Sequence, residues 1–165
     1  MSMIGPVIME LQHEAGNTRR VLERIPEDRF DWQPHPKSMS FGRLASHVAE
    51  IPGYMIPTLD LDEFVMKMDD FKPVVAASRS ELLKIHDGCV AKAVESMQGR
   101  SDAHLLSTWR MVIDGKTALE LPRIGVIRGM ILNHIVHHRG QLTVYLRLND
   151  VPLPALYGPS ADEAG

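Results

Sequence analysis

Apolar residues recur every three or four positions along four stretches of the chain, and this spacing is typical of amphipathic helices. The first stretch covers roughly residues 4–25 and ends before Pro26, which cannot continue a helix. The pattern therefore predicts a long first helix. Its repeating face is formed by Ile8, Leu11, Ala15, Thr18 and Leu22.

The second stretch follows a connector, residues 27–37, whose prolines favour an extended backbone. Ser38 or Ser40 is expected to cap the N-terminus of this helix. Pro52 lies inside the apolar pattern and has no N–H to donate, so we expect a kink or an early end there. Residues 57–73 are expected to form a loop with a short helical piece. The apolar face consists of Phe41, Leu44, Val48, Ile51 and Met55.

A third helix is predicted to start at Ser78, because Glu81 follows it with the spacing of a capping box. Gly99 is suited to the position just after the C-terminus of this helix. Further on, Asp114 and Gly115 form a tight-turn dipeptide and indicate a short hairpin-like excursion. The inward side of the third helix is expected to contain Leu82, Ile85, Cys89, Ala93 and Val94.

The fourth stretch is the longest, with Pro122 at the expected first helical position and apolar periodicity to about Leu148. A helix of about 27 residues at 1.5 Å per residue would be about 40 Å long. Prolines and glycines predict an irregular tail from about residue 150. Strand-favouring aromatic residues make up only 5% of the chain, so we predict an all-α fold, with residues 1–165 forming a single domain.

Charge and composition narrow the range of partners. The net charge is −3 and the basic residues are scattered, which argues against nucleic-acid binding. No apolar run approaches the length needed to span a membrane, and no signal peptide is visible. The single cysteine, Cys89, rules out an internal disulfide and is interpreted as a small buried residue. We therefore expect a cytoplasmic protein without a membrane or nucleic-acid partner.

The strongest candidate for chemistry is the pair His134 and His138, whose spacing places both rings on one face of a helix. With 100° per residue, the two rings lie about 40° apart, in the middle of the apolar face, whereas Arg139 and Arg147 fall on the opposite side. Two such rings are either hydrogen-bonded core histidines or ligands of a divalent metal. The residue after His134 is Ile135 and not glutamate, so the zincin protease motif is absent.

His47 lies near the edge of the second helix's apolar face and is an attractive third ligand. Glu50, or a carbonyl freed by Pro52, could orient its ring. His137 is the main competitor for a ligand role, because it neighbours His134 at i, i+3, but it falls at the edge of the apolar face. The remaining histidines have weaker claims to the site: His13, His35, His86 and His104.

Four segments of the chain resemble one known family. Residues 122–142, PRIGVIRGMILNHIVHHRGQL, are similar to the fourth helix of the DinB/YfiT superfamily of metal-dependent enzymes. Residues 30–40, FDWQPHPKSMS, resemble the connector before that family's second helix, and residues 44–48, LASHV, resemble the segment with its first metal histidine. Residues 151–163 resemble the C-terminal extension of one branch of the family.

This resemblance implies a four-helix bundle with long crossover connections and a homodimer. It also implies that His47, His134 and His138 bind a divalent metal ion, usually zinc or nickel, with water completing the coordination shell. Family members of known activity include thiol-cofactor transferases and a thiol-dependent isomerase. The damage-inducible family named here is unrelated to the DNA polymerase of the same name.

The expected function is therefore that of a metal-dependent enzyme, a thiol-dependent S-transferase acting on a small-molecule electrophile. The substrates would be that electrophile and a low-molecular-weight thiol. A metal-dependent hydrolase and a non-enzymatic helical bundle that binds a metal or a small ligand are the alternatives. No residue can be assigned as the general base from the sequence.

Overall fold

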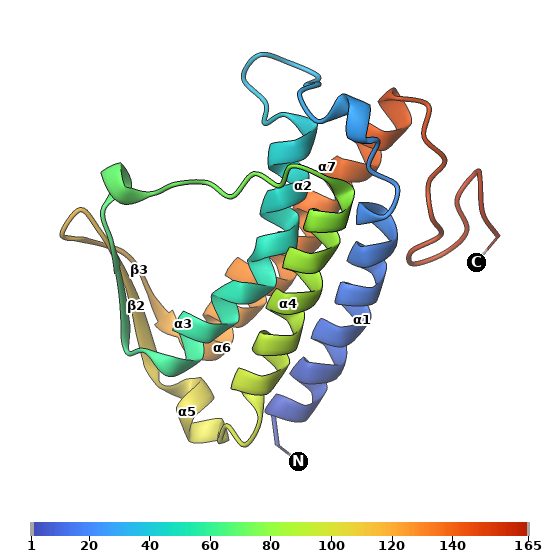
Figure 1. Cartoon of the computed structure of the whole chain (residues 1–165). Coiled ribbons are helices and arrows are strands. Elements are labelled where there is room, and N and C mark those ends of the chain that lie inside the picture. Colours follow the sequence, from blue (N-terminus) through green and yellow to red (C-terminus); the bar gives the residue numbers. More distant parts are fainter. Residues whose placement is uncertain (1, 165) are drawn as a thin grey trace.

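The computed structural model describes residues 2–164, which are mainly helical. Four helical stretches pack side by side, and a small sheet lies against one end of them (Figure 1). The first and third stretches are uninterrupted helices, α1 (Ile4–Leu22) and α4 (Arg79–Met97). Short connecting helices are η1 (Glu27–Arg29), η3 (Met68–Asp70) and α5 (Asp102–Leu106).

The second and fourth stretches are each built from three pieces. The second consists of α2 (Phe41–Glu50), the 3₁₀ turn η2 (Ile51–Tyr54) and α3 (Met55–Asp60). The change to a 3₁₀ turn at Pro52 confirms the predicted break in this helix. The fourth consists of α6 (Arg123–Val126), the π-helical segment η4 (Ile127–Leu132) and α7 (Asn133–Leu148). Pro122 ends a strand and precedes α6, so it is not the first helical residue.

Local capping signals agree with the sequence. The Ser40 hydroxyl accepts a hydrogen bond from the backbone of Arg43, at 3.3 Å, and so Ser40 rather than Ser38 caps α2. Ser78 caps α4 in the same way by accepting from the backbone of Glu81, at 3.1 Å. Gly99 follows α4 with a φ of +70°, a conformation that glycine adopts without strain.

The predicted all-α class is wrong in one respect, because residues 2–164 also contain a three-stranded sheet in the order β1-β2-β3. Strands β2 (Thr108–Ile113) and β3 (Lys116–Pro122) form the expected hairpin around Asp114 and Gly115, both of which have positive φ. Strand β1 (Glu63–Met66) lies parallel to β2, in a segment expected to be loop and short helix. It has only four residues and its partner lies far along the chain, so local pattern gave no signal for it.

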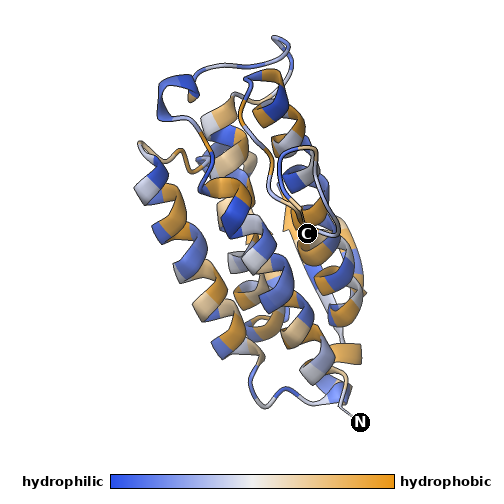
Figure 2. Ribbon diagram, turned by 90° about the vertical axis from the view of Figure 1, so that its right-hand side faces the viewer, coloured by the Kyte–Doolittle hydropathy of each residue, from blue (hydrophilic) through white to orange (hydrophobic). Residues whose placement is uncertain are grey.

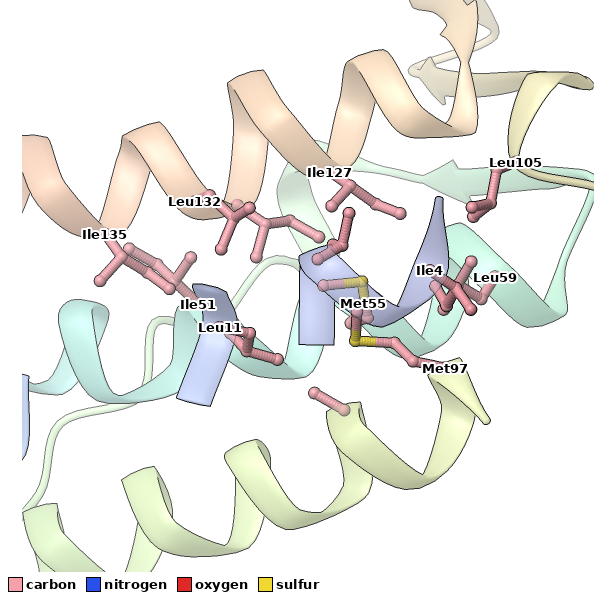
Figure 3. Close-up of a cluster of buried hydrophobic side chains, with 13 residues drawn as sticks. Ile4, Leu11, Ile51, Met55, Leu59, Met97, Leu105, Ile127, Leu132 and Ile135 are labelled. Carbon is pink, nitrogen blue, oxygen red and sulfur yellow. The ribbon is translucent and has the colours of Figure 1, made fainter. Parts of the chain in front are cut away.

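Two clusters of buried side chains hold the helices together, and the alternation of hydropathy along each helix reflects this packing (Figure 2). One cluster lies between the N-terminal half of α1, the second stretch, the end of α4 and η4, and it includes Leu11, Ile51 and Leu132 (Figure 3). The other surrounds α2 and the C-terminal half of α7 and includes Phe41 and Leu142. Together the clusters fix α2 against α7.

The buried face of α7 differs from the prediction. Arg139, expected on the polar side, is only 1% exposed and contacts Glu14 and Tyr157. The fully buried positions are centred about 100° away from His134, so His134 and His138 lie at the edge of this face and not in its middle. A hydropathy pattern assigns every arginine to the solvent-facing side of a helix. Because Arg139 is buried and paired with Glu14, the face predicted from the pattern differs from the face that is buried in the structure.

The inward side of α4 also differs from the prediction. Leu82 and Ala93 are buried as expected, but Ile85 and Cys89 are only half-buried. His86, which is not among the apolar residues that predict the inward side, is 2% exposed and lies in the buried face of the helix. The buried face is therefore rotated by about 30° from the orientation that the apolar residues of the helix suggested.

The tail after α7 is irregular, as predicted, through the last described residues. Ion pairs tie it to the helices: Glu163 contacts Arg20 and Arg24, and Asp162 contacts Arg147. Within residues 2–164, we find no helix with the length and apolar character that crossing a membrane requires.

Candidate metal centre

Three histidines from two helices meet at the surface between α2 and α7. His47 comes from the last turns of α2, whereas His134 and His138 come from the first two turns of α7. The Nε2 atom of His134 is 3.4 Å from Nε2 of His47 and 2.8 Å from Nε2 of His138. All three rings are half-buried, and one candidate ligand atom from each lies within 4.8 Å of the others. The structure thus brings together the three histidines singled out in the sequence.

Each ring is held from behind through its Nδ1 atom. His47 Nδ1 is 3.0 Å from the Glu50 carboxylate, and His138 Nδ1 is 2.7 Å from Oε1 of Gln141. His134 Nδ1 is 3.2 Å from the backbone carbonyl of Met130. These oxygens accept hydrogen bonds, so each Nδ1 is the protonated nitrogen and donates. Each Nε2 therefore carries a free lone pair.

The next feature of the cluster is the charge state of its imidazole rings. Burial lowers the pKa of His134 and lowers the pKa of His138 to about 4, with the neighbouring histidines adding to both effects. Both imidazoles are therefore neutral near pH 7, which is the form that binds metal ions. Lone pairs that face one another repel, and a cation between them would remove this repulsion.

The geometry fits a divalent ion bound by imidazole nitrogens. With Zn–N bonds of 2.0–2.1 Å in a tetrahedral arrangement, neighbouring nitrogens are about 3.3–3.4 Å apart. The separation of 3.4 Å between the His47 and His134 nitrogens matches this value. The 2.8 Å between those of His134 and His138 would have to widen by about 0.5 Å, a small rotation of one ring.

Glu50 connects the cluster to two further side chains. Its carboxylate lies 3.4 Å from the guanidinium of Arg43, and both side chains are largely buried, at 14% and 18% exposure. Burial and this carboxylate raise the pKa of Tyr54, whose ring lies near that of His47, to about 12. The sequence indicates Glu50 as a residue that orients the His47 ring, and the structure shows the contact.

Gln141 was missed, although its position three residues after His138 on one helix could have revealed it. The contact to the Met130 carbonyl could not have been found, because it belongs to a π-helical segment that the sequence did not indicate.

The remaining histidines lie outside the cluster. His137 is exposed, and its ring packs edge-on against that of His138 at 4.7 Å between centroids. His104 bonds to the Leu59 carbonyl, His13 lies 3.3 Å from Asn17, and His86 contacts Asp87. Within residues 2–164, the only group of three or more potential metal ligands is His47, His134 and His138.

Comparison with known proteins places the chain in a family. The chain matches the DinB family over residues 6–164. Protein YrdA of Bacillus subtilis (strain 168) is 25% identical over 152 residues, which cover 92% of this chain and 86% of YrdA.

Two crystal structures have a similar fold. A DinB-like protein from Bacillus cereus ATCC 10987 is 20% identical, with a TM-score of 0.70 over 92% of this chain and 95% of its own. The DinB-like protein YjoA from Bacillus subtilis is 18% identical, with a TM-score of 0.67 over 90% of this chain and 95% of its own. These two likenesses show the fold, and the match of the family model over nearly the whole sequence shows that the chain belongs to the DinB family.

Proposed function

We propose that His47, His134 and His138 bind one divalent ion, zinc or nickel, and that the chain is a metal-dependent enzyme. The observation that carries this proposal is the convergence of three Nε2 atoms whose Nδ1 atoms are all engaged by oxygen acceptors. Three protein ligands leave a coordination position open, which is typical of catalytic rather than structural sites.

Thiol-dependent transfer to an electrophilic small molecule is the reaction that this site supports best. A divalent ion would supply Lewis-acid chemistry, which makes a thiol or water more acidic. Within residues 2–164, no carboxylate belongs to the cluster, and Glu50 is engaged by His47 and Arg43. A bound ion lowers the pKa of either nucleophile, from about 8.5 for a thiol and about 15.7 for water, so neither needs a spare carboxylate as base. The preference for a thiol over water therefore comes from the family resemblance.

The side chains around the three histidines would hold the rings in the orientation that metal binding requires. Glu50 and Gln141 fix the tautomer and the direction of two rings, and Arg43 balances the negative charge of Glu50. Such fixed rings present their lone pairs without a loss of side-chain freedom on binding. The family resemblance adds the expectation of a homodimer, which light scattering would test.

The proposed activity can be tested with 1-chloro-2,4-dinitrobenzene as the electrophile and cysteine or coenzyme A as the thiol. The zinc- or nickel-loaded protein is expected to accelerate conjugation, and the His138→Ala variant is expected to lose this activity. If the loaded protein conjugates neither thiol but hydrolyses 4-nitrophenyl acetate, the hydrolase alternative replaces this proposal. If it does neither, the chain is a binding protein.

A further inference from the structure

An apolar cavity of about 310 Å³ lies between the sheet and the helices. On the sheet, alternate positions line it, because side chains i and i+2 of a strand point to the same face. These positions are Phe64 and Met66 of β1, Trp109, Met111 and Ile113 of β2, and Leu119 of β3. Helical segments supply the other wall with Tyr54, Pro57, Thr58, Val126, Met130 and Ile131, and Phe71 completes it.

The polar groups in the wall are mostly engaged elsewhere. The Thr58 hydroxyl donates to the Tyr54 carbonyl at 2.8 Å, and Trp109 Nε1 donates to the Pro57 carbonyl at 3.0 Å. A charged or strongly polar ligand would lose its hydration in this cavity without gaining partners. The lining therefore selects an apolar group.

Two residues join the cavity to the histidine cluster. Tyr54 lines the cavity, and its ring centroid is 6.5 Å from that of His47. Met130 also lines the cavity, and its carbonyl holds Nδ1 of His134. A molecule with its reactive end at the triad could therefore extend its other end into the cavity.

The rim and the floor of the cavity also point to a binding site. Phe71 and Met130, at 44% and 40% exposure, are the exposed apolar side chains of the lining, so the cavity is open to solvent beside them. Met130 and Ile131 belong to the π-helical segment η4, and π-helical turns occur frequently at functional sites.

We infer that this cavity binds the apolar part of the substrate, a cyclic or branched hydrocarbon group, while the reactive polar end lies at the three histidines. This inference rests on the proposed function and adds the substrate class to it. An engineered cavity of about 150 Å³ binds benzene, so about 310 Å³ holds one ring with substituents or two fused rings. The hairpin β2–β3 and the strand β1 would thus determine specificity.

Hydroxamates that carry different tails test this inference, because a hydroxamate chelates divalent metals. Acetohydroxamate has almost no tail, whereas cyclohexaneacetohydroxamate has one ring. Calorimetric titration of the zinc-loaded protein is expected to show about 10- to 100-fold tighter binding for the second compound, since its ring leaves water. Equal affinities would overturn the inference.

Paired variants of β3 locate the effect. Leu119→Trp fills the cavity and is expected to abolish the advantage of the ring while leaving acetohydroxamate binding unchanged. Glu120→Trp, at the exposed neighbouring position, is expected to keep both affinities. If Leu119→Trp fails to fold, as judged by circular dichroism, Ile113→Phe in β2 takes its place with the same expectation. A full ring advantage in the filled variant would contradict the inference.

A metal-free measurement separates this inference from the proposed function. In a Trp32→Phe variant, Trp109 is the only tryptophan and it lines the cavity. Cyclohexylmethanol, which has the ring but no chelating group, is expected to shift the emission of Trp109 in the metal-free protein. If acetohydroxamate does not bind but Trp109 responds, the metal proposal fails and the cavity inference stands. If Trp109 does not respond, the cavity inference fails whatever the metal result.

Discussion

At the scale of single residues, the orientation of three imidazole rings is the basis of the proposed chemistry. Each ring is fixed by an acceptor behind it, and two of these acceptors are side chains, Glu50 and Gln141. Because such contacts hold a ligand ring in the binding tautomer, their loss should weaken metal binding without removing a ligand.

Replacement of Gln141 by Leu tests this role directly. The Gln141→Leu variant keeps all three histidines but cannot accept the hydrogen bond from His138 Nδ1, so its zinc affinity is expected to fall about 10- to 100-fold. Competition with a fluorescent chelator measures the affinity. Gln98→Leu, at an exposed position after α4, is the matched control and should bind zinc as the wild type does. An unchanged affinity in Gln141→Leu would show that the contact does not orient the ring.

His86 makes the stability of the protein depend on pH. Burial lowers its pKa, with a smaller effect of Arg19, and the adjacent Asp87 opposes this shift. The unfolded chain therefore binds a proton near pH 6.5 while the folded chain resists it, and stability falls as the pH drops below about 6.5. In metal-free protein, His86→Leu is expected to weaken this dependence in urea unfolding between pH 7 and pH 5.

The control for that experiment is His35→Leu, which changes an exposed histidine in the connector. It should keep the slope of the wild type. A His86→Leu variant with the same slope as the wild type would mean that His86 is protonated equally in the folded and unfolded chain.

At the scale of helices and strands, the sequence correctly predicted the features that depend on residues close together along the chain. The caps Ser40 and Ser78, the break at Pro52 and the turn at Asp114 and Gly115 all depend on neighbouring residues, and the structure has each of them. The sequence could not predict strand β1, because β1 pairs with β2, which lies far along the chain. The buried face of α7 was misplaced for a related reason, because the partners of Arg139 come from α1 and the tail.

The buried ion pair between Arg139 of α7 and Glu14 of α1 should contribute strongly to the stability of the packing between these helices. Arg139→Met leaves the Glu14 carboxylate buried without its partner, and the free energy of unfolding is expected to fall by about 3–5 kcal/mol. Arg128→Met removes an exposed pair with Glu10 between the same two stretches and should change stability by at most about 1 kcal/mol. Urea unfolding of both variants makes the comparison.

The double variant Arg139→Met with Glu14→Leu removes both buried charges. It should recover most of the loss, because an apolar pair of similar size needs no compensation for buried charge. A double variant as unstable as Arg139→Met alone would show that packing around the arginine, and not its charge, carries the effect.

At the scale of the whole molecule, the fold places a polar site and an apolar cavity side by side. His47 and His134 are 87 positions apart in the sequence, so spacing alone left the third ligand open, and the family resemblance supplied it. Nothing in the sequence indicated the cavity, since its walls come from six segments whose arrangement depends on the unexpected strand β1. The helices determine where the metal would bind, and the sheet forms one wall of the cavity that would hold the apolar part of the substrate.

The central claim, that the histidine triad holds a metal ion, is tested most directly by elemental analysis of protein purified without a metal-affinity tag. The wild type and His137→Ala should each contain about one divalent ion per chain. His47→Ala, His134→Ala and His138→Ala should contain almost none while remaining folded. Unchanged metal content in the His134 and His138 variants, or loss of the ion in His137→Ala, would contradict the account.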